Sequence, residues 1–195
     1  MTSDPLTDQL NFLKEIDRLK SIVRASPVLD RTRRENSAEH SWHLAMYALV
    51  LSDYAHSSVN INRVIKMLLI HDVVEIDAGD TPIHCARETT EQAELENRAA
   101  DRIFGLLPAG QCAAFRFLWN EFETAETEDA KFAKSLDCLQ PPIQNVETDG
   151  GTWNEHAVTR QQVFERYGPQ IENGSATLWA RASFLVRDFF SKQTL

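Results

Sequence analysis

One stretch of the chain constrains the fold more than any other. Residues 66–76, with the sequence Lys-Met-Leu-Leu-Ile-His-Asp-Val-Val-Glu-Ile, are apolar on almost every side of a helix, and such a helix is expected to be buried. Its polar exceptions are His71, Asp72 and Glu75, which helical spacing places on one face within about one turn, ~5.4 Å. Because buried carboxylates without partners are very unfavourable, Asp72 and Glu75 require a cationic partner, a proton or a metal ion.

The rest of the chain also predicts helices. Only 7 Gly and 7 Pro in 195 residues leave little material for the turns of a many-stranded sheet. Helical spacing of apolar residues, or signals for helix ends, occur in eight segments, which we expect to form an all-α bundle around one core. These segments are 10–23, 36–51, 60–79, 88–105, 108–122, 127–139, 153–171 and 175–191.

Several helix boundaries are marked in the sequence. We expect the first helix to stop before Pro27, and Asn36 followed by Glu39 predicts a capping box at the start of the second. Gly79 and the turn residues Asp80-Thr81-Pro82 predict the end of the third helix. The dipeptide at 141–142, Pro-Pro, predicts the end of the sixth.

Charge and cysteine content limit the class of protein. A net charge of -9 and a pI near 5.1 argue against a general binder of nucleic-acid polymers, which needs a basic surface. Cys85, Cys112 and Cys138 are widely spaced and include no Cys-x-x-Cys pair, so we interpret them as reduced thiols. No run approaches the roughly 20 apolar residues that span a bilayer. We therefore expect a soluble, cytoplasmic protein with no membrane partner.

Two further polar residues lie in apolar surroundings, His40 in the second helix and Asp137 in the sixth. With His71 and Asp72 they would give a nitrogen and oxygen ligand set with open positions, suited to Mn, Fe, Co, Ni or Zn. Alternatively, Asp137 is a buried salt-bridge partner of Lys134, and His71-Asp72 is a helix cap or a surface pair. The remaining histidines are interpreted as structural: His43, His56, His84 and His156. Alternatively, His43 supports the metal ligands from the side.

The order His40, His71-Asp72, Asp137 resembles the signature of the HD-domain metal-dependent phosphohydrolases. The match is closest to the 5'-deoxynucleotidase branch, through residues 33–41 (Arg-Arg-Glu-Asn-Ser-Ala-Glu-His-Ser) and 71–82 (His-Asp-Val-Val-Glu-Ile-Asp-Ala-Gly-Asp-Thr-Pro). The resemblance covers roughly residues 10–140, the HD core. We expect residues 141–195 to form helices that pack on the same core, in one domain overall.

The resemblance implies a role for each matching residue. The four metal ligands would be His40, His71, Asp72 and Asp137. Glu75 matches the acid that assists catalysis, and Asp80 matches a further acid that steadies the site or helps a second metal. Arg24 matches an arginine that holds the substrate phosphate, and Arg33 could assist it in stabilising charge. Alternatively, Arg24 complements the C-terminal dipole of the first helix, and Arg33 belongs to a solvated run of charge.

The implied activity is the removal of phosphate from nucleoside 5'-monophosphates by a homodimeric, divalent-metal-dependent enzyme. In the bacterial deoxynucleotidase an aromatic residue beside the phosphate-binding arginine disfavours a 2'-hydroxyl, whereas Ala25 follows Arg24 here. We therefore expect weak discrimination between deoxyribose and ribose. Two alternatives stay open: an HD-type hydrolase of nucleoside triphosphates, cyclic nucleotides or another phosphoester, and a non-catalytic nucleotide-binding regulatory module. Glu75 and Asp80 argue against the module, since a purely structural metal would not require them.

Overall fold

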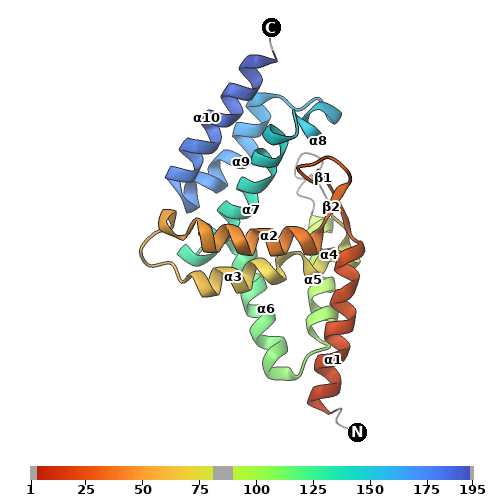
Figure 1. The fold of residues 1–195 in the computed structure, drawn as a ribbon. Helices are drawn as coiled ribbons and strands as arrows, with labels where there is room; N and C mark the ends of the chain where they lie inside the picture. Colours follow the sequence, from red (N-terminus) through yellow and green to blue (C-terminus); the bar gives the residue numbers. More distant parts are fainter. Residues whose placement is uncertain (1–3, 81–89, 194–195) are drawn as a thin grey trace.

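The computed structural model describes residues 4–80 and 90–193, and this part of the chain is mainly helical (Figure 1). The α-helices are α1 Pro5–Ile16, α2 Ser37–Val50, α3 Ile61–Ile70, α4 Glu75–Ala78, α5 Thr90–Phe104, α6 Ala109–Thr124, α7 Glu128–Glu147, α8 Gly151–Glu155, α9 Arg160–Gly174 and α10 Ala176–Lys192. Three short 3-10 segments are η1 Asp17–Ser21, η2 Ser52–Tyr54 and η3 His71–Val74. The predicted all-α class is confirmed.

The first predicted helix is shorter than expected. It ends at Ile16, and after η1 the chain forms strand β1, Val23–Pro27, which pairs antiparallel with β2, Arg34–Asn36. The β-branched side chains of Ile22 and Val23 favour a strand over a helix. Arg24 therefore lies in a strand, and the alternative in which it complements a helix C-terminus is wrong.

The predicted capping box is confirmed, because the Asn36 side chain accepts from the backbone N–H of Glu39 and the Glu39 side chain accepts from that of Asn36. This box begins α2 three residues before His40. The next predicted helix, 60–79, starts at its Asn60 cap but is divided into α3, η3 and α4. Gly79, with a φ of 78°, ends α4 as expected. Thr81 and Pro82 lie outside the described residues.

The end predicted at 141–142 is wrong, because α7 continues to Glu147 with both prolines inside it. A proline lacks an N–H, so the carbonyls four residues earlier, those of Asp137 and Cys138, lose their helical donors. The helix nevertheless continues, and it packs along α9 and buries Pro142, Gln144 and Asn145. The segment 153–171 is also not one helix: α8 ends at Glu155, and a new capping box at Thr159 starts α9.

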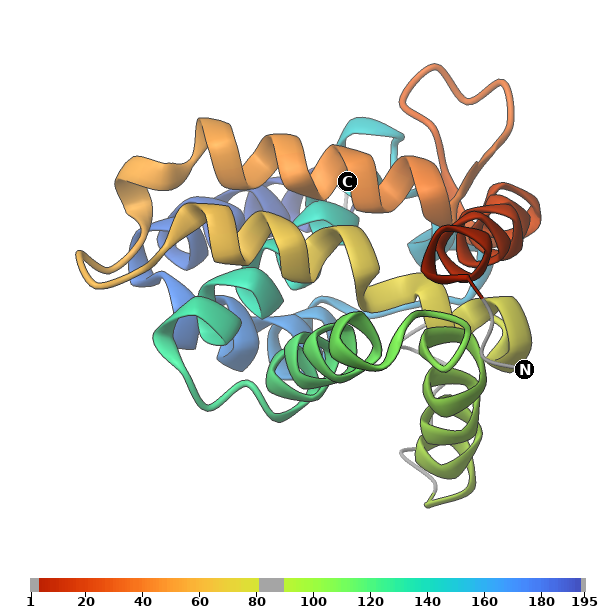
Figure 2. The same cartoon turned by 90° about the horizontal axis from the view of Figure 1, so that it is seen from below.

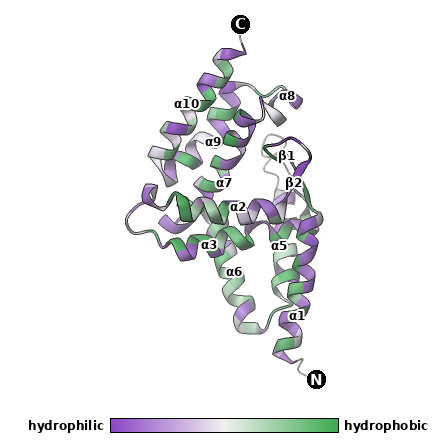
Figure 3. Ribbon diagram, viewed as in Figure 1, coloured by the Kyte–Doolittle hydropathy of each residue, from purple (hydrophilic) through white to green (hydrophobic). Residues whose placement is uncertain are grey.

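The core consists of two clusters of buried apolar residues. The first joins α2, α3, α7, α9 and α10, and the second joins α1, η3, α4, α5 and α6. Figures 1 and 2 both show α2 and α3 side by side, and Figure 3 shows hydrophobic and hydrophilic residues alternating along α1 and α10, as in helices with one buried face. His71 and Asp72 follow Leu68 of the first cluster and precede Val73 of the second. Among the described residues, no helix is long and apolar enough to span a bilayer.

Candidate metal centre

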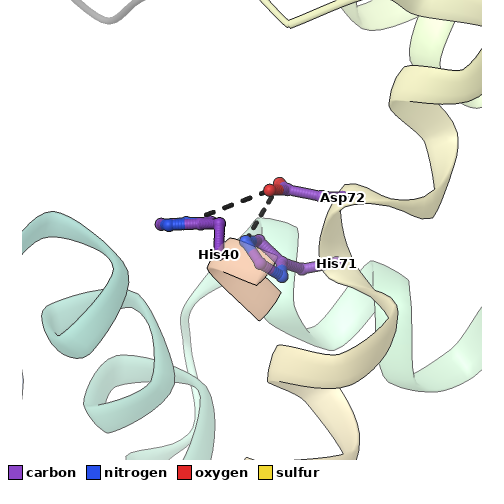
Figure 4. A group of neighbouring side chains, drawn as sticks. All are labelled: His40, His71 and Asp72. Carbon is purple, nitrogen blue, oxygen red and sulfur yellow. Dashed lines mark ion pairs between the residues drawn. The ribbon is translucent and has the colours of Figure 1, made fainter. Parts of the chain in front are cut away.

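The structure brings together all four residues that the sequence predicts as metal ligands. His40 comes from α2, His71 and Asp72 from η3, and Asp137 from α7. Figure 4 shows the first three, with ion-pair contacts from both histidines to Asp72; each offers one ligand atom, and these atoms lie within 4.8 Å of one another. Asp137 Oδ1 lies 3.2 Å from His40 Nε2 and 3.7 Å from His71 Nε2.

The two imidazoles are oriented with their Nε2 atoms toward these carboxylates. His71 Nδ1 donates to the Leu68 carbonyl over 2.9 Å, so Nε2 is the nitrogen that a cation can bind. This Nε2 lies 2.9 Å from Asp72 Oδ1, yet it is buried and makes no hydrogen bond of good geometry. His40, fully buried, turns Nε2 toward Asp137. Two imidazole nitrogens and two carboxylates converge, a donor set that fits a divalent transition ion.

Arg24 extends from β1 into the same cluster. Its Nη1 lies 2.8 Å from Asp72 Oδ2, 3.5 Å from Glu75 Oε1 and 3.4 Å from Asp80 Oδ1. Burial opposes the charge of the guanidinium, but the acids Asp72, Glu75 and Asp80 outweigh it and raise the pKa of Arg24. The structure therefore places Arg24, Glu75 and Asp80 beside the candidate ligands.

The candidate ligands shift one another's pKa values. Burial disfavours the charged forms, but His71 and Arg24 lower the pKa of Asp72 to about 2. Asp72 and Asp137 raise the pKa of His71 to about 10 against the same burial, and the hydrogen bond with His40 together with the nearby charge of His71 holds the pKa of Asp137 well below its usual range. Without a metal ion, a protonated His71 thus balances the two aspartates. Metal binding needs the neutral imidazole, so the ion and this proton compete.

The pKa of Glu75 shifts in the opposite direction from the pKa values of Asp72 and Asp137. Burial and the charge of Asp72 raise the pKa of Glu75 to about 9, although Arg24 opposes them. The Ser37 hydroxyl donates to Glu75 Oε2 over 2.5 Å and so fixes the orientation of the carboxyl group. In the metal-free cluster, Glu75 therefore holds a proton at neutral pH next to Arg24.

Arg33 is not brought to the cluster. Its guanidinium makes two hydrogen bonds to the carboxylate of Glu39, and its side chain is 55% exposed. Arg33 follows Thr32 in the loop before β2, and the pair with Glu39 holds it at the surface. This placement agrees with the alternative of a solvated run of charge.

The ion-pair partner of Lys134 is Glu123, whereas the salt-bridge alternative for Asp137 paired Lys134 with that aspartate. Its Nζ lies 3.3 Å from Glu123 Oε1 and 4.0 Å from the centre of the Phe122 ring. Burial opposes the charge of Lys134, but Glu123 and then Asp137 raise its pKa. Asp137 itself faces His40 and His71, as the metal-ligand interpretation requires.

Sequence reasoning missed Glu35, Ser37 and Gln140, all of which are buried beside the cluster. Glu35 and Ser37 lie within the 33–41 stretch that carries the family resemblance, and Gln140 lies about one helical turn after Asp137. In the sequence, their closeness to the candidate ligands was the feature that could have identified them. Of the histidines interpreted as structural, His43 packs on Trp42 and Tyr47 and His56 contacts Ser58; His84 lies outside the described residues.

Comparison with known proteins agrees with this arrangement. The 5'-deoxynucleotidase HDDC2 of Homo sapiens is 30% identical over 80% of this chain and 74% of its own. The 5'-deoxynucleotidase of Erwinia tasmaniensis is 32% identical over 78% of this chain and 80% of its own. A crystal structure from Magnetospirillum magnetotacticum MS-1, described as a "predicted metal-dependent phosphohydrolase", is 50% identical and superposes with a TM-score of 0.91 over 98% of both chains.

A family model for the HD domain matches residues 16–179, which extends well beyond residues 10–140, the region of the family resemblance. The match confirms the family resemblance and covers α7, α8 and α9 as well as the candidate ligands. The chain belongs to the HD-domain family.

Proposed function

We propose that this protein hydrolyses nucleoside 5'-monophosphates and that His40, His71, Asp72 and Asp137 hold the divalent metal ion that the reaction needs. The observation that carries this proposal is the convergence of two imidazole Nε2 atoms and two carboxylates next to the buried Arg24. The names of the relatives, which are 5'-deoxynucleotidases in vertebrates and bacteria, support the substrate class.

Different side chains of the site would perform different parts of the reaction. When bound, a divalent ion lowers the pKa of a coordinated water and neutralises charge on phosphoryl oxygens. Arg24 orients the phosphate by donating from its guanidinium, and Asp80 and Asp72 fix the guanidinium in place. Glu75, which Ser37 orients beside Arg24, would donate a proton to the leaving 5'-oxygen. Because the transition state of phosphoryl transfer is loose and rich in charge, positioning and electrostatic stabilisation carry most of the catalysis.

The alternative hydrolases of nucleoside triphosphates or cyclic nucleotides would use the same cluster and differ in the residues that receive the rest of the substrate. The non-catalytic regulatory module is less well supported. A structural metal has no need of a buried, protonated Glu75 held by Ser37 beside Arg24, whereas a hydrolase needs this group as an acid.

The proposal extends to assembly and location. An apolar stripe on α2 leaves four side chains exposed at helical spacing, and we assign it to contact with a second copy of the chain. The stripe consists of Trp42, Met46, Leu49 and Val50. We further propose one domain in which residues 141–195 complete the core around α7, and a cytoplasmic protein with reduced cysteines. The metal would be Mn, Co, Fe, Ni or Zn.

The test is phosphate release from deoxyribo- and ribonucleoside mono-, di- and triphosphates and from cyclic nucleotides, with Mn, Co, Fe, Ni, Mg and Zn supplied in turn. We expect release from the 5'-monophosphates, loss of activity on chelation, and recovery when metal is returned. Full activity of metal-free protein would refute the metal-dependent mechanism. Release from triphosphates or cyclic nucleotides alone would favour the alternative hydrolases.

A further inference from the structure

Glu35 is a buried carboxylate that the proposed mechanism does not use. It is the only buried residue of β2 and is 4% exposed. Burying a charged carboxylate is costly unless donors surround it. Gln140 Nε2 supplies one such donor, 3.1 Å from Oε1 and 3.3 Å from Oε2.

Two further donors face Glu35 Oε2, and each belongs to a residue of the candidate site. His40 Nδ1 lies 3.5 Å from this oxygen and Arg24 Nε lies 4.0 Å from it. Both nitrogens are buried, and neither has a hydrogen-bond partner among the described residues. Because an unpaired buried donor costs free energy, the position of Glu35 Oε2 makes it the acceptor available to both nitrogens.

We propose that Glu35 is a positioning residue that sets both the metal ligand His40 and the phosphate-binding Arg24; this inference rests on the proposed function. A carboxylate facing Nδ1 keeps a proton on that nitrogen, so His40 presents Nε2 to the cation. The same oxygen attracts Nε of Arg24 and leaves Nη1 to face Asp72 and the incoming phosphate.

A simpler explanation is that Glu35 only ties β2 to α7 through Gln140. The two explanations predict different measurements. A tie between two elements affects stability and leaves the affinity for metal and phosphate unchanged in protein that remains folded. A positioning residue changes both affinities, because it orients His40, which would bind the metal, and Arg24, which would bind the phosphate.

The test compares Glu35→Gln with Glu155→Gln. Glu155 provides a matched control because it, too, faces an arginine of the two-stranded sheet, Arg34 of β2, but is half-exposed at 46% of its side chain. Mn²⁺ is titrated into metal-free protein to give its Kd, and inorganic phosphate is titrated into Mn²⁺-loaded protein. KM and kcat are then measured at saturating Mn²⁺ on the best 5'-monophosphate substrate.

For Glu35→Gln we expect Mn²⁺ to bind about 10–100-fold more weakly, the range for groups that orient metal ligands. We also expect weaker phosphate binding and a KM that rises more than kcat falls, with Glu155→Gln like the wild type. Glu35→Asp keeps the charge and should lie between wild type and Glu35→Gln. If Glu35→Gln does not fold, unchanged affinities in Glu35→Asp overturn the proposal and reduced ones support it.

Unchanged Mn²⁺ or phosphate affinity in folded Glu35→Gln would refute the joint role. Failure of the proposed function would look different, because wild-type protein would then release no phosphate from any 5'-monophosphate. The two titrations do not depend on turnover, so they would still decide whether Glu35 positions His40 and Arg24.

Discussion

Asp72 divides its two oxygens between the candidate cation site and Arg24. Its Oδ1 lies 2.9 Å from His71 Nε2, while Arg24 Nη1 donates to its Oδ2 over 2.8 Å. The Arg24 guanidinium therefore orients Asp72 and lies directly beside the candidate cation site. If Arg24 binds the substrate phosphate and the four candidate ligands hold the ion, as proposed, this shared contact on Asp72 would bring the phosphate close to the ion.

Replacing Asp72 with alanine should remove metal and activity together. The change leaves His40, His71 and Asp137 as an incomplete ligand set and frees Arg24 from its nearest acid. We expect metal content and turnover to fall in parallel. Metal analysis and rate measurements on the same preparation check this expectation. The matched control is Asp77→Ala, since Asp77 pairs with Arg102 away from the candidate ligands.

Glu75→Gln should separate proton transfer from metal binding. The amide keeps the size of the side chain and can still accept from Ser37, but it has no proton to give to a leaving group. We expect near-normal metal content and turnover lower by about 10²–10⁴-fold, the usual contribution of a general acid or base. Metal loss would instead identify Glu75 as a ligand, and unchanged turnover would make it structural.

The sequence predicted which residues come together better than it predicted the path of the chain around them. His40, His71, Asp72 and Asp137 were recognisable because a polar residue in apolar surroundings needs a partner. Arg24 could not be placed from periodicity alone, since its pairing in β1 depends on β2, about ten residues away. The continuation of α7 through its two prolines also depends on a distant element, α9, which covers the buried face. Local sequence patterns cannot predict such contacts between distant elements.

The stability of the metal-free protein should fall as pH rises. Glu75 has a pKa of about 9 in the folded chain against an ordinary value of 4.5, so the folded state retains a proton that the unfolded chain releases. The stabilisation is complete below about pH 4.5 and is lost as pH rises through about 9, with a slope of at most about 1.4 kcal/mol per pH unit. His71, raised from 6.5 to about 10, acts in the same direction.

Urea unfolding of metal-free wild type and Glu75→Gln at about pH 5, 6.5 and 8 isolates the contribution of Glu75. His71 is present in both proteins, so its contribution largely cancels in the comparison. We expect Glu75→Gln to gain stability relative to wild type at each higher pH. Parallel curves would show that the pKa of Glu75 is not raised in the folded protein.

Charge placed on the apolar stripe of α2 should separate the proposed dimer. Met46→Glu and Val50→Glu introduce carboxylates on the exposed face of α2, where burial against a second copy would be unfavourable. Sedimentation velocity should show a dimer for wild type and a monomer for both variants. Leu6→Glu, on the exposed face of α1, should leave the dimer intact. A monomeric wild type would exclude the assignment of the stripe.

Sugar preference should be weak, because Ala25 has no ring to pack against a nucleotide. Ala25 follows Arg24 in β1, and its carbonyl accepts a hydrogen bond from Arg34. In the bacterial deoxynucleotidase that the chain resembles, the residue at this position is aromatic and disfavours a 2'-hydroxyl. We expect kcat/KM for dAMP and AMP to differ by less than about tenfold, that is by less than about 1.4 kcal/mol in transition-state binding.

Ala25→Trp should raise the preference for dAMP over AMP, chiefly by lowering kcat/KM for AMP, because the ring would occupy the space of the 2'-hydroxyl. Ala25→Leu adds bulk without an aromatic face and separates filling of space from stacking on the sugar. If Leu matches Trp, volume alone decides the preference. A strong preference for dAMP in the wild type would contradict the prediction and assign sugar selection to a residue other than the one that follows Arg24.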